Sequence, residues 1–150
     1  MKVMKFGGTS VGSPARMKEV TKLVTKSGEP VFVVLSAMSG TTNSLVEISN
    51  YLYKKNPEGA SEIINQLERA YLKHIDELYQ TDEMKQLTRE FLTSEINYLR
   101  SFTKELFTSF EEKSIVAQGE IISTNMVVNY LQECGVKAVL LSAQVENMKS

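Results

Sequence analysis

A short apolar strand at the start of the chain runs into the sequence Lys5-Phe6-Gly7-Gly8-Thr9-Ser10-Val11-Gly12, after which a helix is predicted. Glycine has no Cβ, so the backbone of such a loop can turn sharply and its N–H groups can approach an anion closely. The N-terminus of the following helix adds a partial positive charge, and Lys5 adds a full one. The segment therefore predicts a phosphate-binding loop.

The glycine pattern alone leaves a second interpretation open, because a glycine pair after a strand is also typical of an ordinary tight turn. The loop matches neither the P-loop pattern nor the dinucleotide-binding fingerprint. Lys5 favours the phosphate interpretation, since Val3-Met4-Lys5-Phe6 otherwise has the composition of a buried strand. A charge in such a strand is costly unless an anion meets it.

Three segments resemble the aspartokinases within the amino acid kinase family. The first is the lysine-glycine string itself. The others follow in the family's order and are Leu35-Ser36-Ala37-Met38-Ser39-Gly40-Thr41-Thr42-Asn43 and Gln118-Gly119-Glu120-Ile121-Ile122-Ser123. The resemblance implies an aspartate kinase, a phosphotransferase that moves the ATP γ-phosphoryl group to the β-carboxylate of L-aspartate. Its product, 4-phospho-L-aspartate, begins lysine, threonine and methionine biosynthesis.

The resemblance also implies a set of site residues, together with ATP and Mg²⁺ as cofactors. Lys5 and Glu120 are the expected catalytic residues, and no protein ligand is assigned to the metal. The matching positions are Lys5, Gly7, Gly8, Thr9 and Ser10 for the ATP phosphates, and Ser36, Thr42 and Glu120 for aspartate.

Glu120 is also conspicuous without any family knowledge. It precedes Ile121-Ile122 in a helix that is apolar on most faces, so its carboxylate should be paired with a cation. That cation is either the substrate ammonium or Lys5, and we expect Lys5 and Glu120 to face one cavity. A substrate carboxylate is already ionised at neutral pH, so the reaction needs no histidine, and His74 is expected on a solvated helix face.

Strand and helix signals predict an α/β fold, a three-layer α/β/α sandwich with a mainly parallel sheet. The predicted strands are Val3–Phe6, Val31–Leu35 and Val136–Leu141, with Val31–Leu35 covered on both faces. A right-handed crossover places the loops after the first two strands at one sheet edge, where ligands bind in such folds.

A long helical insertion is expected to form an antiparallel hairpin whose two apolar stripes face the core. Thr81-Asp82 separates the two helices, and residues 142–150 show no pattern. The stripes are Ile64, Leu67, Tyr71 and Leu78, and then Met84, Leu87, Phe91, Tyr98, Phe102 and Leu106.

Composition sets the remaining limits. The net charge of −1 among 150 residues gives no reason to expect nucleic acid or an acidic membrane surface. A single cysteine, Cys134, and the lack of a signal peptide or a membrane-length apolar stretch favour a cytoplasmic protein. We expect a homo-oligomer that binds L-aspartate and ATP.

The family's later Gly-Arg-Gly-Gly-Ser-Asp segment is absent from the chain. Residues 1–150 are therefore expected to be the N-terminal part of the kinase catalytic domain, without its C-terminal nucleotide-binding part or the ACT regulatory domains, and inactive alone. Two alternatives stay open. One is another amino acid kinase, acting on glutamate, acetylglutamate or carbamate. The other is a non-catalytic fragment that binds ligand or self-associates.

Overall fold

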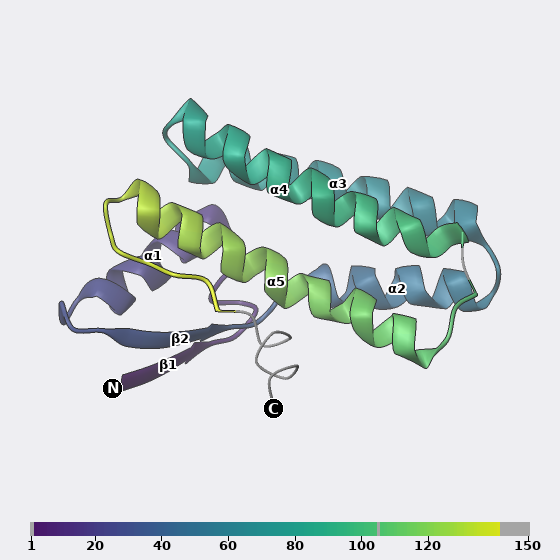
Figure 1. Cartoon of the computed structure of the whole chain (residues 1–150), viewed down its shortest axis with the longest axis horizontal. Helices are drawn as coiled ribbons and strands as arrows, with labels where there is room; N and C mark the ends of the chain where they lie inside the picture. Colours follow the sequence, from purple (N-terminus) through teal and green to yellow (C-terminus); the bar gives the residue numbers. More distant parts are fainter. Residues whose placement is uncertain (1, 105, 142–150) are drawn as a thin grey trace.

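The computed structural model describes residues 2–104 and 106–141, so the predicted pattern-free tail at 142–150 lies outside the described residues. Figure 1 shows two strands along one side of a mainly helical molecule. In chain order the elements are β1 (Lys2–Phe6), α1 (Pro14–Thr25), β2 (Val31–Leu35), α2 (Thr41–Tyr53), α3 (Pro57–Leu78), α4 (Asp82–Ser101), the 3₁₀ turn η1 (Phe102–Lys104) and α5 (Ser109–Glu133).

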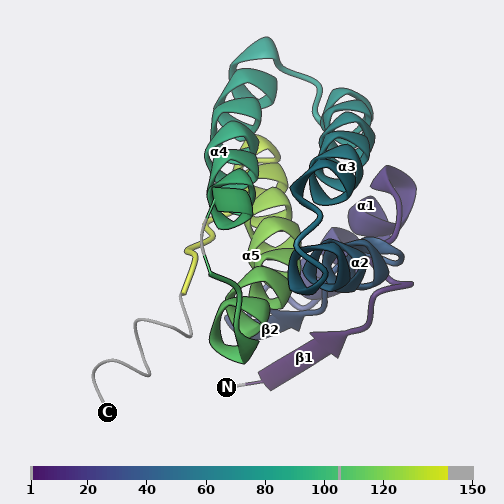
Figure 2. The ribbon, with the colours of Figure 1, turned by 90° about the vertical axis from the view of Figure 1, so that its right-hand side faces the viewer.

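The sheet contains β1 and β2, which pair in parallel with Lys2 opposite Val31 and Phe6 opposite Leu35. Helix α1 makes the crossover, so both strands end at the same edge, as predicted. In both views the helices lie on one side of the strands (Figures 1 and 2). The predicted α/β class with a parallel sheet is confirmed. Cover on both faces of β2 is not found in the described chain, because Phe32 and Val34 stay 42% and 41% exposed.

Local signals set the ends of α1. The Ser13 hydroxyl accepts a hydrogen bond from the Arg16 N–H at 3.2 Å, and Pro14 occupies the first turn. Gly28 follows the helix with a φ of 71°, a left-handed conformation that costs glycine little. These signals bring the chain into β2 beside β1.

The predicted helical hairpin is confirmed as α3 and α4, which lie side by side and antiparallel (Figure 1). Thr81 caps α4 by accepting a hydrogen bond from the Met84 N–H at 3.2 Å. All four residues of the predicted α3 stripe are buried. The second stripe is half right: Phe102 is buried and Met84 and Phe91 pack against the core, but Leu87, Tyr98 and Leu106 are exposed. The buried residues of α4 itself are Thr88, Leu92, Ile96 and Leu99.

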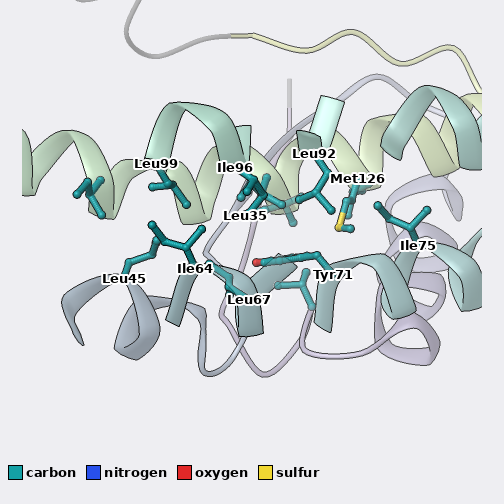
Figure 3. Close-up of a cluster of buried hydrophobic side chains, with 14 of the residues drawn as sticks. Leu35, Leu45, Ile64, Leu67, Tyr71, Ile75, Leu92, Ile96, Leu99 and Met126 are labelled. Atoms are coloured by element: carbon teal, nitrogen blue, oxygen red, sulfur yellow. The ribbon is translucent and has the colours of Figure 1, made fainter. Parts of the chain in front are cut away.

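The core lies between the hairpin and helices α2 and α5. Figure 3 shows side chains of both hairpin helices meeting Leu35 of β2, Leu45 of α2 and Met126 of α5. The prediction for His74 is wrong: its side chain is buried in this region, with Nε2 3.2 Å from the Met17 sulfur. Burial lowers the pKa of His74 to about 4, so the ring is neutral at pH 7.

The predicted third strand, Val136–Leu141, is also wrong. This segment is not a strand, and within the described chain β1 pairs with β2 alone. Its polar groups turn back toward α5 instead: the Val136 N–H donates to the Leu131 carbonyl at 2.9 Å, and the Ala138 carbonyl accepts from the Gln132 side chain at 3.0 Å. Across the residues that the structure describes, no helix combines the length and apolar character needed to cross a membrane.

Candidate functional site

Two loops meet at the carboxyl edge of the sheet, as the topology predicts. The Ser36 N–H extends the strand pairing by donating to the Phe6 carbonyl at 3.0 Å. Three residues further along this loop, the Ser39 N–H donates to the Gly8 carbonyl at 3.1 Å. The lysine-glycine loop and the serine-threonine loop therefore form one connected surface.

Two glycines allow the close approach of these segments. A Cβ on Gly8 would lie 2.8 Å from the Ala37 carbonyl oxygen, and a Cβ on Gly119 of α5 would lie 2.7 Å from the Ala37 Cβ. Both distances are too short for real side chains, so larger residues would push the segments apart. Gly119 thus lets α5, which carries the adjacent Glu120, pack closely against the loop that follows β2.

A hollow of about 370 Å³ opens between these segments. It brings together four predicted site residues that are far apart in the sequence, namely Gly8, Ser36, Thr42 and Glu120. The complete lining is Gly8, Ser36, Ala37, Met38, Ser39, Gly40, Thr42, Asn43, Val116 and Glu120.

One side of the hollow suits an anion. Helix α2 begins beneath it, with Gly40 at the N-cap in a left-handed conformation (φ 86°) and no acidic residue in the first turn. The N–H groups of Thr42 and Asn43 have no hydrogen-bond acceptor within residues 2–104 and 106–141. Free N–H groups at the start of a 13-residue helix favour a carboxylate or a phosphate.

Glu120 suits a cation, because this acidic residue is exposed and lines the hollow. The prediction that Glu120 lies inside a buried helix is wrong for its own side chain, which is exposed. Gly119, Ile122 and Ser123 carry the buried face of α5, and Glu120 lies on its open face. Glu120 forms no salt bridge among the described residues, so its carboxylate is available to a ligand ammonium.

The expectation that Lys5 and Glu120 face one cavity is wrong in this structure, because Lys5 does not line the hollow. It is exposed on β1 opposite Val34, while its neighbour Phe6 packs against the core. An ion pair between Lys5 and Glu120 is not formed among the residues that the structure describes. The predicted contact of Lys5 with ATP phosphates stays a prediction.

The other predicted phosphate-binding residues, Gly7, Thr9 and Ser10, belong to the loop that ends at Gly12. The Ser10 N–H donates to the Gly7 carbonyl at 3.0 Å, so this donor is already used. The N–H groups of Gly7, Gly8 and Thr9 find no acceptor in the described part of the chain. Three consecutive free donors are compatible with anion binding, although neither Gly7 nor Thr9 lines the hollow.

The sequence prediction missed some lining residues. Asn43 lies in the first turn of α2, which starts at Thr41, and contributes a free N–H. Val116 lies one helical turn before Glu120, a spacing that could have indicated a shared face. A second hollow of about 460 Å³ continues from Val116 and Glu120 toward Glu112 and Lys113.

The chain resembles known proteins over most of its length. The model of the amino acid kinase family matches residues 1–148. The chloroplastic aspartokinase 1 of Arabidopsis thaliana is 34% identical over 147 residues, which cover 91% of this chain and 24% of that protein. An aspartate kinase of Pseudomonas putida is 49% identical over 53 residues, which cover 33% of this chain and 13% of that enzyme.

A solved structure is similar over most of the fold. E. coli aspartokinase III, in complex with aspartate and ADP, gives a TM-score of 0.74 at 26% identity, covering 93% of this chain and 30% of that one. The resemblance to aspartokinases is therefore confirmed, and the chain spans only 24% of the Arabidopsis protein's length. Since the family model matches nearly every residue, the chain belongs to the amino acid kinase family.

Proposed function

We propose that this chain forms the aspartate-binding part and the phosphate-facing loop of an aspartate kinase. The complete protein would transfer the ATP γ-phosphoryl group to the β-carboxylate of L-aspartate. Residues 1–150 would then be the N-terminal part of the catalytic domain. Its similarity to an aspartokinase solved with aspartate and ADP supports this proposal.

The observation that carries the proposal is the charge arrangement of the hollow. An amino acid has an ammonium group and carboxylates held a few ångströms apart. The hollow is lined by a carboxylate residue, Glu120, and by Thr42 and Asn43 of α2, whose N–H groups are free in the described chain. Hydroxyls of Ser36 and Thr42 can donate to a carboxylate oxygen without filling the space. A hollow of about 370 Å³ is large enough for aspartate.

The reaction needs no strong general base, because the nucleophile is a carboxylate that is already ionised. One β-carboxylate oxygen bonds to the γ-phosphorus, and the bond from that phosphorus to the β-γ bridging oxygen breaks, leaving ADP. Two anions must be brought together, so positioning and neutralisation of charge supply most of the catalysis. Lys5 and the loop Gly7–Ser10 would offset the phosphate charge, while Glu120 would hold the substrate ammonium.

The use of Mg²⁺ with ATP stays a prediction. Among residues 2–104 and 106–141 there is no group of three acidic, histidine or cysteine side chains that could hold a metal ion. Magnesium is commonly bound by nucleotide phosphates, water and one or two carboxylates. The proposal therefore assigns these residues to substrate and leaves Mg²⁺ to the nucleotide phosphates.

The setting of the complete protein is part of the proposal. We expect it in the cytoplasm or in an organelle such as the chloroplast, where the Arabidopsis relative is found. A lone, exposed Cys134 is compatible with either compartment. A homo-oligomer stays a prediction.

The test is a coupled assay of ADP formation by the complete protein that carries this chain. L-Aspartate is compared with L-glutamate, N-acetylglutamate and carbamate. We expect turnover with aspartate, while turnover with another acceptor alone would overturn the assignment. Glu120→Gln should raise the aspartate KM by roughly 10- to 100-fold, because a charged hydrogen bond is lost. Glu77→Gln, which removes an exposed carboxylate on α3, should leave the KM unchanged.

A further inference from the structure

The hydroxyl of Ser123 joins α5 to the loop that carries Ser36. Ser123 is completely buried, and its Oγ donates to the Ser36 carbonyl oxygen at 2.7 Å. A second acceptor, the Glu120 carbonyl in the same helix, lies farther away at 3.2 Å. A hydroxyl has one proton, so the bond to Ser36 is the stronger of the two.

The bond from Ser123 fixes the second main-chain polar group of Ser36, its carbonyl. Its N–H is already held by the Phe6 carbonyl at the end of β1. With its carbonyl held by Ser123, both main-chain polar groups of Ser36 are bound, one to the sheet and one to α5. The side chain is left exposed at the hollow.

The same helix carries Glu120, three residues before Ser123. Ser123 is on the buried face of α5 and Glu120 is on the open one. Gly119 adds a second contact, since it packs directly beneath Ala37. The distance between the Ser36 hydroxyl and the Glu120 carboxylate therefore depends on how α5 is held against this loop.

We propose that Ser123 is a positioning residue for the substrate hollow, which sets the spacing between the Ser36 hydroxyl and the Glu120 carboxylate without touching the ligand. The inference rests on the proposed aspartate kinase function. A substrate that is bound at both of its ends binds best when the two protein groups that contact it are held at a constant separation. Losing the Ser123 bond should therefore affect aspartate more than ATP.

The experiment compares Ser123→Ala with Ser49→Ala in the complete protein. Ser49 is a matched control, because it is also completely buried in a helix, yet its hydroxyl donates only to the Leu45 carbonyl of α2. We expect Ser123→Ala to raise the aspartate KM about three- to tenfold, as for the loss of one hydrogen bond. The ATP KM should stay within about twofold in both variants, as should the aspartate KM of Ser49→Ala.

Hydrogen exchange gives a readout that does not depend on activity. The Ser39 N–H, bonded to the Gly8 carbonyl, should exchange faster in Ser123→Ala than in Ser49→Ala. Equal aspartate KM values or equal loop exchange in the two variants would overturn the role proposed for Ser123 and leave the proposed function standing. A wild-type protein that forms no ADP with aspartate would overturn the proposed function first.

Discussion

Thr41 and Tyr71 share a buried hydrogen bond between their hydroxyl oxygens, at 2.6 Å. Thr41 begins α2 at the edge of the hollow, whereas Tyr71 lies in the middle of α3 within the core cluster (Figure 3). Burial raises the pKa of Tyr71 to about 12, which keeps the phenol neutral, and the bond to Thr41 opposes that rise. The helical hairpin is thereby tied to the start of the helix that offers its N–H groups to a ligand.

Tyr71→Phe tests this connection, because it removes the hydroxyl and keeps the buried ring. We expect the free energy of unfolding to fall by about 1 kcal/mol, with an unsatisfied Thr41 hydroxyl left behind. Urea denaturation measures the change. Tyr98→Phe is the control, since Tyr98 is 44% exposed and its hydroxyl makes no hydrogen bond among the described residues. Equal losses in the two variants would contradict the role given to the Thr41 bond.

Much of the fold could be predicted because its signals are local. Ser13 and Thr81 cap α1 and α4, and Gly28 and Gly135 take left-handed conformations just after α1 and α5. The stripe of α4 could not be predicted in the same way. The aromatic Tyr98 and the apolar Leu87 suggested a buried face, but tertiary packing buries Leu92 and its helical neighbours instead.

The site was predictable to a similar degree. Topology predicted that the loop with Ser36 and Thr42 lies beside the lysine-glycine loop, because parallel strands end at a common edge, and the resemblance to aspartokinases added Glu120. The buried contact between Ser123 and Ser36 joins residues 87 positions apart, and no local pattern indicates such a contact. The third strand failed for the same reason, since a strand depends on a partner elsewhere in the chain.

Gly119→Ala tests the close packing beneath the hollow. Alanine in a helix normally stabilises it relative to glycine by about 1 kcal/mol. Here the new methyl group would lie 2.7 Å from the Ala37 Cβ, so we expect a net loss of about 1–3 kcal/mol and a higher aspartate KM. Thermal unfolding and the coupled kinase assay measure the two effects.

A second substitution separates this clash from any other effect of Gly119→Ala. Adding Ala37→Gly removes the Ala37 methyl group with which the new methyl group would clash. The double variant should therefore recover most of the lost stability and aspartate affinity. Of the two remaining contacts, the Leu45 methyl at 3.2 Å is the end of a flexible side chain, and the Thr41 methyl at 3.4 Å is at ordinary contact distance. No recovery in the double variant would show that the Ala37 contact is not what Gly119 permits.

The chain's one histidine predicts a pH dependence of stability. The pKa of His74 is about 4 in the folded protein, against an ordinary value of 6.5. Between these values the unfolded chain takes up a proton that the folded protein does not, so acid favours unfolding. Stability should be highest above pH 6.5 and fall by up to about 3 kcal/mol as the pH drops toward 4.

His74→Gln separates this effect from that of the carboxylates, which titrate in the same acidic range. Glutamine is neutral throughout, so the variant should lose stability less steeply between pH 6.5 and 5. Urea denaturation at a series of pH values gives both curves. Parallel curves for the wild type and the variant would mean that the folded His74 is protonated as easily as the unfolded one.

Lys5→Met tests the one predicted catalytic residue that does not line the hollow. The side chain is exposed and forms no ion pair in the described chain, so the melting temperature should change little. If the ammonium offsets charge on the transferring phosphate, kcat should fall by about 10²- to 10³-fold, as for other lost transition-state donors. Lys2→Met, on the same strand, should keep wild-type kcat. A Lys5→Met enzyme with near-normal kcat would leave the exposed lysine as a surface residue of β1.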